Sequence, residues 1–207
     1  MPINKIYTQA AEHLINFDFA DILTDVGYVN FYGIDDEADN YRLSRLQIES
    51  TDVKSTITGT TGNVERNFDF EFNISKKVKG DLYVTITIFA DGFGSATGQN
   101  DTTIEIFHFD GSTETTIGTQ QSIAQLNNPS STNQDEYRTT LTFAVDKLFK
   151  RGDKLRIEVI SSVTSSNSNS KAGFYHDGAN RGFSLTDQHG IAANSNLIIQ
   201  VPFDLDI

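Results

Sequence analysis

Hydrophobic and polar residues alternate with a period of two along most of this chain. Over residues 68–75, apolar side chains alternate with Asp, Glu, Asn and Ser. The same period recurs over 82–89, 140–145, 155–160 and 197–204. Because successive side chains of a strand point to opposite faces of a sheet, this pattern predicts strands with one buried face.

Weaker versions of the pattern raise the expected number of strands to about nine or ten. They cover 27–34, 41–50, 102–109 and 115–123. Pro202 lacks the N–H that a ladder needs, so the last strand is expected at a sheet edge or at a bulge. The long polar segments between strands are expected to be loops; they are 51–67, 91–101, 125–136, 163–171 and 181–195.

The number and length of these strands predict an all-β fold, a two-sheet antiparallel β-sandwich with the jelly roll as the leading topology. Residues 21–207 contain no linker and no internal repeat, so they are expected to form a single domain. Residues 1–20 are expected to form either a short helix or a docked arm. Their apolar residues recur at spacings of three and four, and they are Ile3, Ile6, Ala10 and Leu14.

The composition narrows the class of protein. A formal net charge of −12 repels phosphate backbones, so we expect no nucleic-acid partner. Cysteine is absent, which excludes disulfides and fits a reducing compartment. The first residues lack the apolar run of a signal peptide, and no apolar run approaches about 20 residues. We therefore expect synthesis in the cytoplasm and no membrane segment.

Two acidic clusters are weak candidates for a calcium site. Asp35 and Asp36 belong to the first, and Asp91 and Asp101 flank the loop of the second. Calcium takes about six to eight oxygen ligands, and acidic β loops can supply them, but neither spacing is that of an EF-hand. We expect solvated loops and no cofactor, with a bound cation or a contact between subunits as the alternative.

The His176-Asp177 pair is the one place where an imidazole could be oriented for acid–base work. The alternative is a structural turn, in which Asp177 accepts hydrogen bonds from the following amides, Gly178 eases the bend and Arg181 pairs with Asp177. We favour the turn. Because no nucleophile elbow, His-Glu-x-x-His, P-loop or dinucleotide motif is present either, the sequence predicts no catalytic residue and a protein that is not an enzyme.

Four segments carry a resemblance to a known group of proteins. They are Gly-Asp-Lys-Leu-Arg-Ile-Glu-Val at 152–159, Gly-Phe-Tyr-His-Asp-Gly-Ala-Asn-Arg at 173–181, the closing Leu-Ile-Ile-Gln-Val-Pro-Phe-Asp-Leu at 197–205, and the opening over 17–33. This set resembles uncharacterised virion structural proteins of tailed bacteriophages and related marine viruses.

The resemblance implies a late structural protein of the virion, located on the capsid surface or the tail. The leading expectation is a head decoration (cement) protein that bridges subunits of the shell, forms a homotrimer, has the major capsid protein as partner, and reaches its neighbours with residues 2–16. The alternative is a carbohydrate-binding β-sandwich, or a tail or fibre component, that recognises a host surface. Against that alternative, Trp is absent and the 7 Tyr are spread along the chain.

Overall fold

The structure, a computed structural model, describes residues 26–36, 40–93, 96–128, 134–180, 183–184, 192–193 and 196–204. Within these ranges the regular secondary structure is entirely β. The expected helix or arm over 1–20 lies outside the described residues, together with its stripe of Ile3, Ile6, Ala10 and Leu14. Arg181 lies outside them as well.

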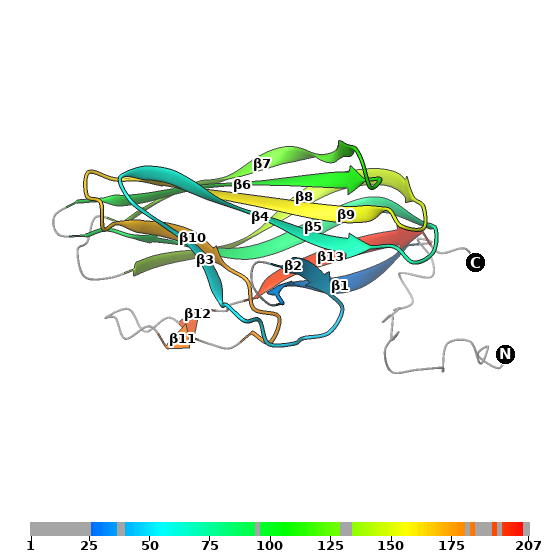
Figure 1. Cartoon of the computed structure of the whole chain (residues 1–207), viewed down its shortest axis with the longest axis horizontal. Helices are drawn as coiled ribbons and strands as arrows, with labels where there is room; N and C mark the ends of the chain where they lie inside the picture. Colours follow the sequence, from blue (N-terminus) through cyan, green and yellow to red (C-terminus); the bar gives the residue numbers. More distant parts are fainter. Residues whose placement is uncertain are drawn as a thin grey trace.

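Figure 1 labels the strands of the described residues. They are β1 (Val26–Asp35), β2 (Tyr41–Ser44), β3 (Lys54–Thr58), β4 (Thr61–Glu71), β5 (Lys76–Asp91), β6 (Gly98–Phe109), β7 (Glu114–Asn128), β8 (Gln134–Phe149), β9 (Lys154–Thr164), β10 (Lys171–Tyr175), β11 (Phe183–Ser184), β12 (Ala192–Ala193) and β13 (Leu197–Asp204).

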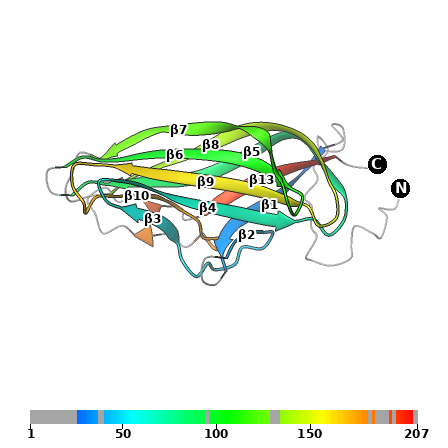
Figure 2. The same ribbon diagram turned by 45° about the horizontal axis from the view of Figure 1, so that its top comes forward.

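The long strands form two layers that run along the same axis (Figures 1 and 2). Hydrogen-bonded neighbours give the order β8-β5-β13-β1-β2 in one layer, where β10 and β3 continue from β5, and β4-β9-β6-β7 in the other. One parallel bridge, from Arg42 to Asp69, joins the layers through β2 and β4. The other ladders of the described strands are antiparallel. The predicted all-β sandwich is therefore confirmed.

The chain passes repeatedly from one layer to the other, as it does in jelly-roll sandwiches. The connections from β4 to β5, β5 to β6, β7 to β8 and β8 to β9 all change layer. The last strand lies between β5 and β1, so the two ends of the described chain meet inside one sheet. This arrangement depends on pairings between residues that are far apart in the sequence.

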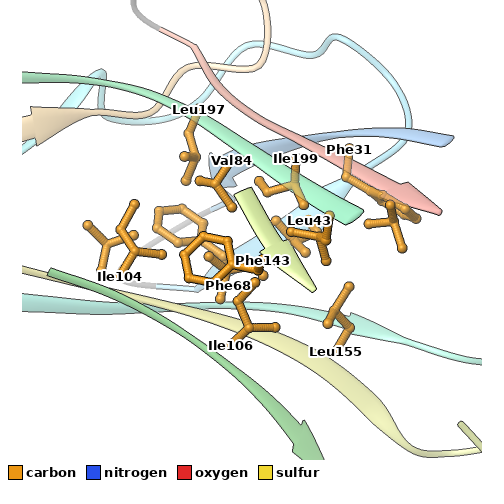
Figure 3. Packing of buried hydrophobic residues seen from close by; sticks show 14 of the residues in the cluster. Phe31, Leu43, Phe68, Val84, Ile104, Ile106, Phe143, Leu155, Leu197 and Ile199 are labelled. Atoms are coloured by element: carbon orange, nitrogen blue, oxygen red, sulfur yellow. The ribbon is translucent and has the colours of Figure 1, made fainter. Parts of the chain in front are cut away.

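The hydrophobic core fills the space between the layers (Figure 3). Val84 and Ile199 of one layer face Ile104 and Ile106 of the other, and all four are fully buried. Around these positions each strand alternates buried apolar residues with partly exposed ones, so the period of two in the sequence predicted the inward face. The largest side chains of the core are aromatic, and they include Phe31, Phe68, Phe143, Phe149 and Phe174.

The predicted loop over 51–67 is wrong, because it contains β3 and the first part of β4. Residues 61–63 are exposed, so they show no apolar alternation, but they pair with residues 164–162 of β9. Pairing with a neighbour supplies their backbone hydrogen bonds whatever the side chains are. The expected loop over 125–136 is wrong for the same reason, since β7 runs to Asn128 and β8 begins at Gln134.

Two further expectations need adjusting. Pro202 lies in a central strand, and a register shift between Gln200 and Phe203 accommodates it, so the bulge is confirmed and the edge is not. The alternation over 68–75 ends at Phe72, because the chain turns there and leaves Ile74 58% exposed.

Candidate functional site

The His176-Asp177 pair follows β10 and lies wholly inside the molecule, with no exposed surface on either residue. The His176 amide donates to the Val53 carbonyl at 2.8 Å, and the imidazole Nε2 lies 2.9 Å from the Ser55 hydroxyl. Both contacts come from the neighbouring strand β3 and the residue before it. The pair is therefore held by β3 and β10 together.

Aromatic rings surround the His176 side chain. The rings of Tyr41, Phe68 and Phe174 have their centroids 5.4, 5.6 and 5.8 Å from that of His176. Burial in this apolar shell lowers the pKa of His176 to about 4, because water cannot solvate the charged ring. At neutral pH the ring is uncharged, and it has no exposed atom through which a substrate could reach it.

Asp177 and Gly178 shape the turn that follows. The Asp177 Oδ1 accepts hydrogen bonds from the amides of Ala179 at 3.0 Å and Ser50 at 3.3 Å. A Cβ at Gly178 would lie 2.7 Å from a methyl carbon of Ile34 and 2.7 Å from the Ile48 carbonyl oxygen. The glycine is needed for this close approach of two segments, a reason that the sequence did not reveal.

The acidic candidates for a cation do not come together. Asp35 is buried at the end of β1, and Asp36 pairs with Arg42 at 2.5 Å. Asp91 ends β5, whereas Asp101 lies on β6, exposed, and accepts a hydrogen bond from Gln125 at 3.0 Å. Within the described ranges, no three His, Asp or Glu side chains are grouped so that they could hold a metal ion.

A buried pair of a histidine and a carboxylate, which sequence reasoning missed, lies at one end of the sandwich. His108 Nε2 on β6 is 2.6 Å from Asp153 Oδ2, in the turn between β8 and β9. The same carboxylate oxygen accepts a hydrogen bond from the Lys150 amide at 2.8 Å, which closes the turn. The turn also bonds to the end of β4, since Gly152 N donates to Phe72 O at 2.7 Å.

Basic and apolar side chains gather around this turn, and we name the region the basic end. Of the 16 Lys and Arg residues in the chain, seven occur here: Lys76, Lys77, Lys79, Lys147, Lys150, Arg151 and Lys154. Ile74 and Leu148 are exposed among them by 58% and 55%. Lys77 pairs with Asp146 at 3.1 Å on the surface. Acidic side chains share this end, since Lys154 lies 3.6 Å from Asp69 and Asp204 ends β13.

The first described strand starts at the basic end. Val26 is paired with Asp204, and the adjacent Phe203 is paired with Val78 on β5, within the basic end. Figure 1 shows β13 ending at the same end as the turn between β8 and β9. The described chain therefore begins at the end of the sandwich that carries these lysines.

Comparisons with known proteins yield only distant structural similarities. No family model and no curated protein matches the sequence. Among solved structures, the chain is similar to a CocE/NonD family hydrolase from Staphylococcus aureus (9% identity, 86% of this chain and 37% of that chain, TM-score 0.49). It is also similar to an aminopeptidase from a marine sediment archaeon, Thaumarchaeota archaeon (9% identity, 84% and 36%, TM-score 0.47). A structure of infectious bursal disease virus matches with 12% identity, 83% and 46% coverage and a TM-score of 0.25.

The prediction that the chain is not an enzyme is corrected by these findings, because the similar structures include a hydrolase and an aminopeptidase. The chain spans little more than a third of each of those two proteins. At this identity and these TM-scores, the likeness transfers no activity, substrate or catalytic residue to this chain. None of the described residues belongs to a helix that could cross a membrane.

Proposed function

We propose that this chain is a structural protein of a virion, and that it attaches to its neighbours through the basic end. The role that fits best is decoration of a phage head, with the major capsid protein as the shell partner and a homotrimer as the assembly. The observation that carries the proposal is the exposure of Ile74 and Leu148 among lysines, at the end of the sandwich where β1 begins.

The charge of residues 1–25 complements the basic end. This segment carries Glu12, Asp18, Asp21 and Asp25 against a single Lys5. Its apolar residues include the stripe Ile3, Ile6, Ala10 and Leu14, which is too short to fold by itself in water. In the proposed assembly, residues 1–25 of one copy dock on the basic end of the next copy, and this linkage bridges the subunits.

Attachment by opposite charges has a measurable signature. Exposed ion pairs are screened by salt, so self-association of the full-length chain is expected to weaken as salt is raised. Apolar contacts with Ile74 and Leu148 resist salt. A part of the association is therefore expected to persist at high salt and to be lost in a Leu148→Asp variant.

The deciding experiment is sedimentation of three full-length proteins, alone and with empty particles. A Lys150→Glu/Arg151→Glu variant is expected to lower both the oligomeric state and the particle occupancy, since both side chains are exposed at the basic end. Lys171→Glu is the matched control, because Lys171 is exposed on β10, outside the basic end. Equal oligomeric state and equal occupancy for all three proteins would reject attachment through the basic end.

A deletion of residues 1–16 tests the other half of the contact. If these residues form the bridge, the truncated protein should keep its β circular dichroism spectrum and lose association to the same extent as the charge-reversal variant. Combining the two changes should then add little, because both remove the same contact. Additive losses would show that the segment and the basic end act at different places.

A further inference from the structure

The outer side of the layer β8-β5-β13-β1 carries a group of tyrosine, amide and hydroxyl side chains, and we name it the tyrosine face. Its residues alternate with core residues: Phe31, Val84 and Ile199 point inward and are fully buried, so their chain neighbours point outward. Tyr28 on β1 and Tyr83 on β5 lie on this outer side, with ring centroids 5.8 Å apart.

The strand registers align the face into two rows across four strands. The first row consists of Asn30, Gln200, Tyr83 and Thr142. The second row consists of Tyr32, Ile198, Thr85 and Thr140. Tyr28 stands beside the first row, opposite Pro202. The sequence could not show this group, since its members come from four strands that are far apart along the chain.

The face is open to solvent over these rows and closed beyond them. Asn30, Thr140 and Thr142 are exposed, and the tyrosine rings are half-buried. Further along β5 the outward residues Thr87 and Phe89 are buried, so the open area ends there. The tyrosine rings thus stand on a sheet and are each partly accessible to solvent.

Polar groups on the face are held in place by their neighbours. Gln200 Nε2 donates to Asn30 Oδ1 at 3.2 Å, and the hydroxyls of Thr85 and Thr140 are 2.8 Å apart. Each amide has more donor and acceptor sites than this one bond uses. Groups that are already oriented lose little conformational freedom when a ligand binds, and this favours affinity.

Neither row contains a charged side chain. Asp81 lies on the same side two residues before Tyr83, and Arg138 lies beyond Thr140 at the other border. A neutral face bordered by one acid and one base offers no attraction to an anionic polymer. Its middle positions mix the amide of Gln200 and the hydroxyl of Thr85 with Tyr83 and Ile198, so polar and apolar groups alternate across it.

We propose that the tyrosine face binds a neutral glycan. The flat C–H side of a sugar ring stacks on an aromatic ring, and two neighbouring tyrosines provide room for two successive sugars. Sugar hydroxyls pair with the amides of Asn30 and Gln200, with the threonine hydroxyls and, as donors, with the Asp81 carboxylate. This inference concerns a different surface from the basic end and does not depend on the proposed attachment.

The test uses the full-length protein and two kinds of probe. A printed array of neutral and sialylated oligosaccharides identifies the glycan class, and electrophoresis in gels that contain β-glucan, xylan, galactomannan or starch measures retardation by neutral polymers. Saturable binding to at least one neutral glycan is expected. Tyr83→Ala is expected to weaken that binding by about tenfold or more, as for removal of a central aromatic contact.

Tyr137→Ala is the matched control, because Tyr137 is 46% exposed on β8 and pairs with the inward-facing Ile88, away from the tyrosine face. It should bind as the unchanged protein does. Thr142→Arg provides a second variant in case Tyr83→Ala folds poorly, since Thr142 is exposed and a long charged side chain there covers the first row.

Four results would overturn the proposal. The first is no binding to any neutral glycan on the array or in the gels. The second is binding that Tyr83→Ala and Thr142→Arg leave unchanged while both variants keep their β circular dichroism spectra. The third is binding restricted to sialylated glycans, which would show that charge, and not this face, is recognised. The fourth is binding of a virion protein to the tyrosine face while no glycan binds, which would identify a protein partner in place of a glycan.

Discussion

His108 and His176 are both buried, yet their surroundings differ in kind. His108 faces the carboxylate of Asp153 at 2.6 Å, at the basic end. His176 faces the hydroxyl of Ser55 and three aromatic rings, between β3 and β10. The first region places a carboxylate beside the imidazole, whereas the second offers a neutral hydroxyl and aromatic rings.

The pKa of the Asp153 carboxyl reflects this difference in surroundings. Desolvation raises the pKa of Asp153, but the hydrogen bonds from His108 and from the Lys150 amide outweigh it, so the pKa lies below its ordinary value. At His176 desolvation dominates, and the pKa falls to about 4. His176 is fully buried and His108 nearly so, and the polar group nearest to each ring differs.

The largest expected loss of stability comes from a substitution in the aromatic shell of His176. Phe68 is fully buried against His176 and Tyr41, so Phe68→Ala is expected to lower the free energy of unfolding by about 3–5 kcal/mol. Phe70, which the alternation also marks as apolar, is only partly buried and serves as the control, with a smaller loss in Phe70→Ala. Urea denaturation measures the free energy of unfolding of both variants. Equal losses would contradict the deeper burial of Phe68 than of Phe70.

The next effect is on the acid stability of the same region. A histidine in the unfolded chain has a pKa of about 6.5, so the unfolded state takes up the proton first as the pH falls. The neutral His176 ring therefore contributes fully above about pH 6.5, and about 3 kcal/mol is lost as the pH falls toward its pKa of about 4. Urea midpoints across this range should fall more steeply for the unchanged protein than for His176→Gln. Parallel pH profiles would show that His176 is not neutral in the fold.

The contact between His108 and Asp153 at the basic end should respond differently to pH. Asp153→Asn keeps an acceptor for the Lys150 amide but removes the charge beside His108, and it is expected to cost about 1.5–3 kcal/mol at neutral pH. Because the Asp153 pKa is lowered, this contribution is present above the ordinary carboxyl pKa and is lost as the pH falls through the lowered value. The difference between the two proteins should therefore shrink in acid.

Asp146→Asn is the control for that variant, since Asp146 is an exposed partner of Lys77 and surface pairs contribute less than about 1 kcal/mol. Equal losses for Asp153→Asn and Asp146→Asn in thermal or urea unfolding would mean that the buried pair adds nothing beyond a surface pair.

The smallest expected effect is at the neutral partner of His176. Ser55→Ala removes the hydroxyl 2.9 Å from the imidazole Nε2 and should cost about 0.5–1.5 kcal/mol, as for one neutral hydrogen bond. Ser122→Ala, at an exposed position on β7, should change the unfolding free energy by less than that. A nuclear magnetic resonance titration of His176 in the Ser55 variant would also show whether the ring stays neutral without its partner.

The sequence predicted strands best where inward and outward positions differ in polarity. The alternation over 155–160 matches the buried and half-buried positions of β9 in the structure. It failed over 51–67, where β3 and early β4 are polar on exposed positions and only pairing with other strands makes them regular. Periodicity reports which side of a strand is buried, and it reports nothing where neither side is.

The candidate sites also differ in whether the sequence could reveal them. The sequence drew attention to His176 and Asp177 because they are adjacent, and the structure places both in one buried turn. His108 and Asp153 are 45 residues apart, and no local pattern links them. The tyrosine face could not be predicted either, because Tyr28 and Tyr83 meet only after β13 has paired with both of their strands.

By itself, then, the sequence determined the all-β class, the inward positions of the main strands and the acidic balance of the chain, because each depends on composition or on neighbours along the chain. The tertiary structure alone decided that β13 lies between β1 and β5, that Asp153 reaches His108, and that lysines gather at one end. The reason is physical: strand order and register are set by contacts between distant segments, and a side chain acquires its partner only when those segments meet.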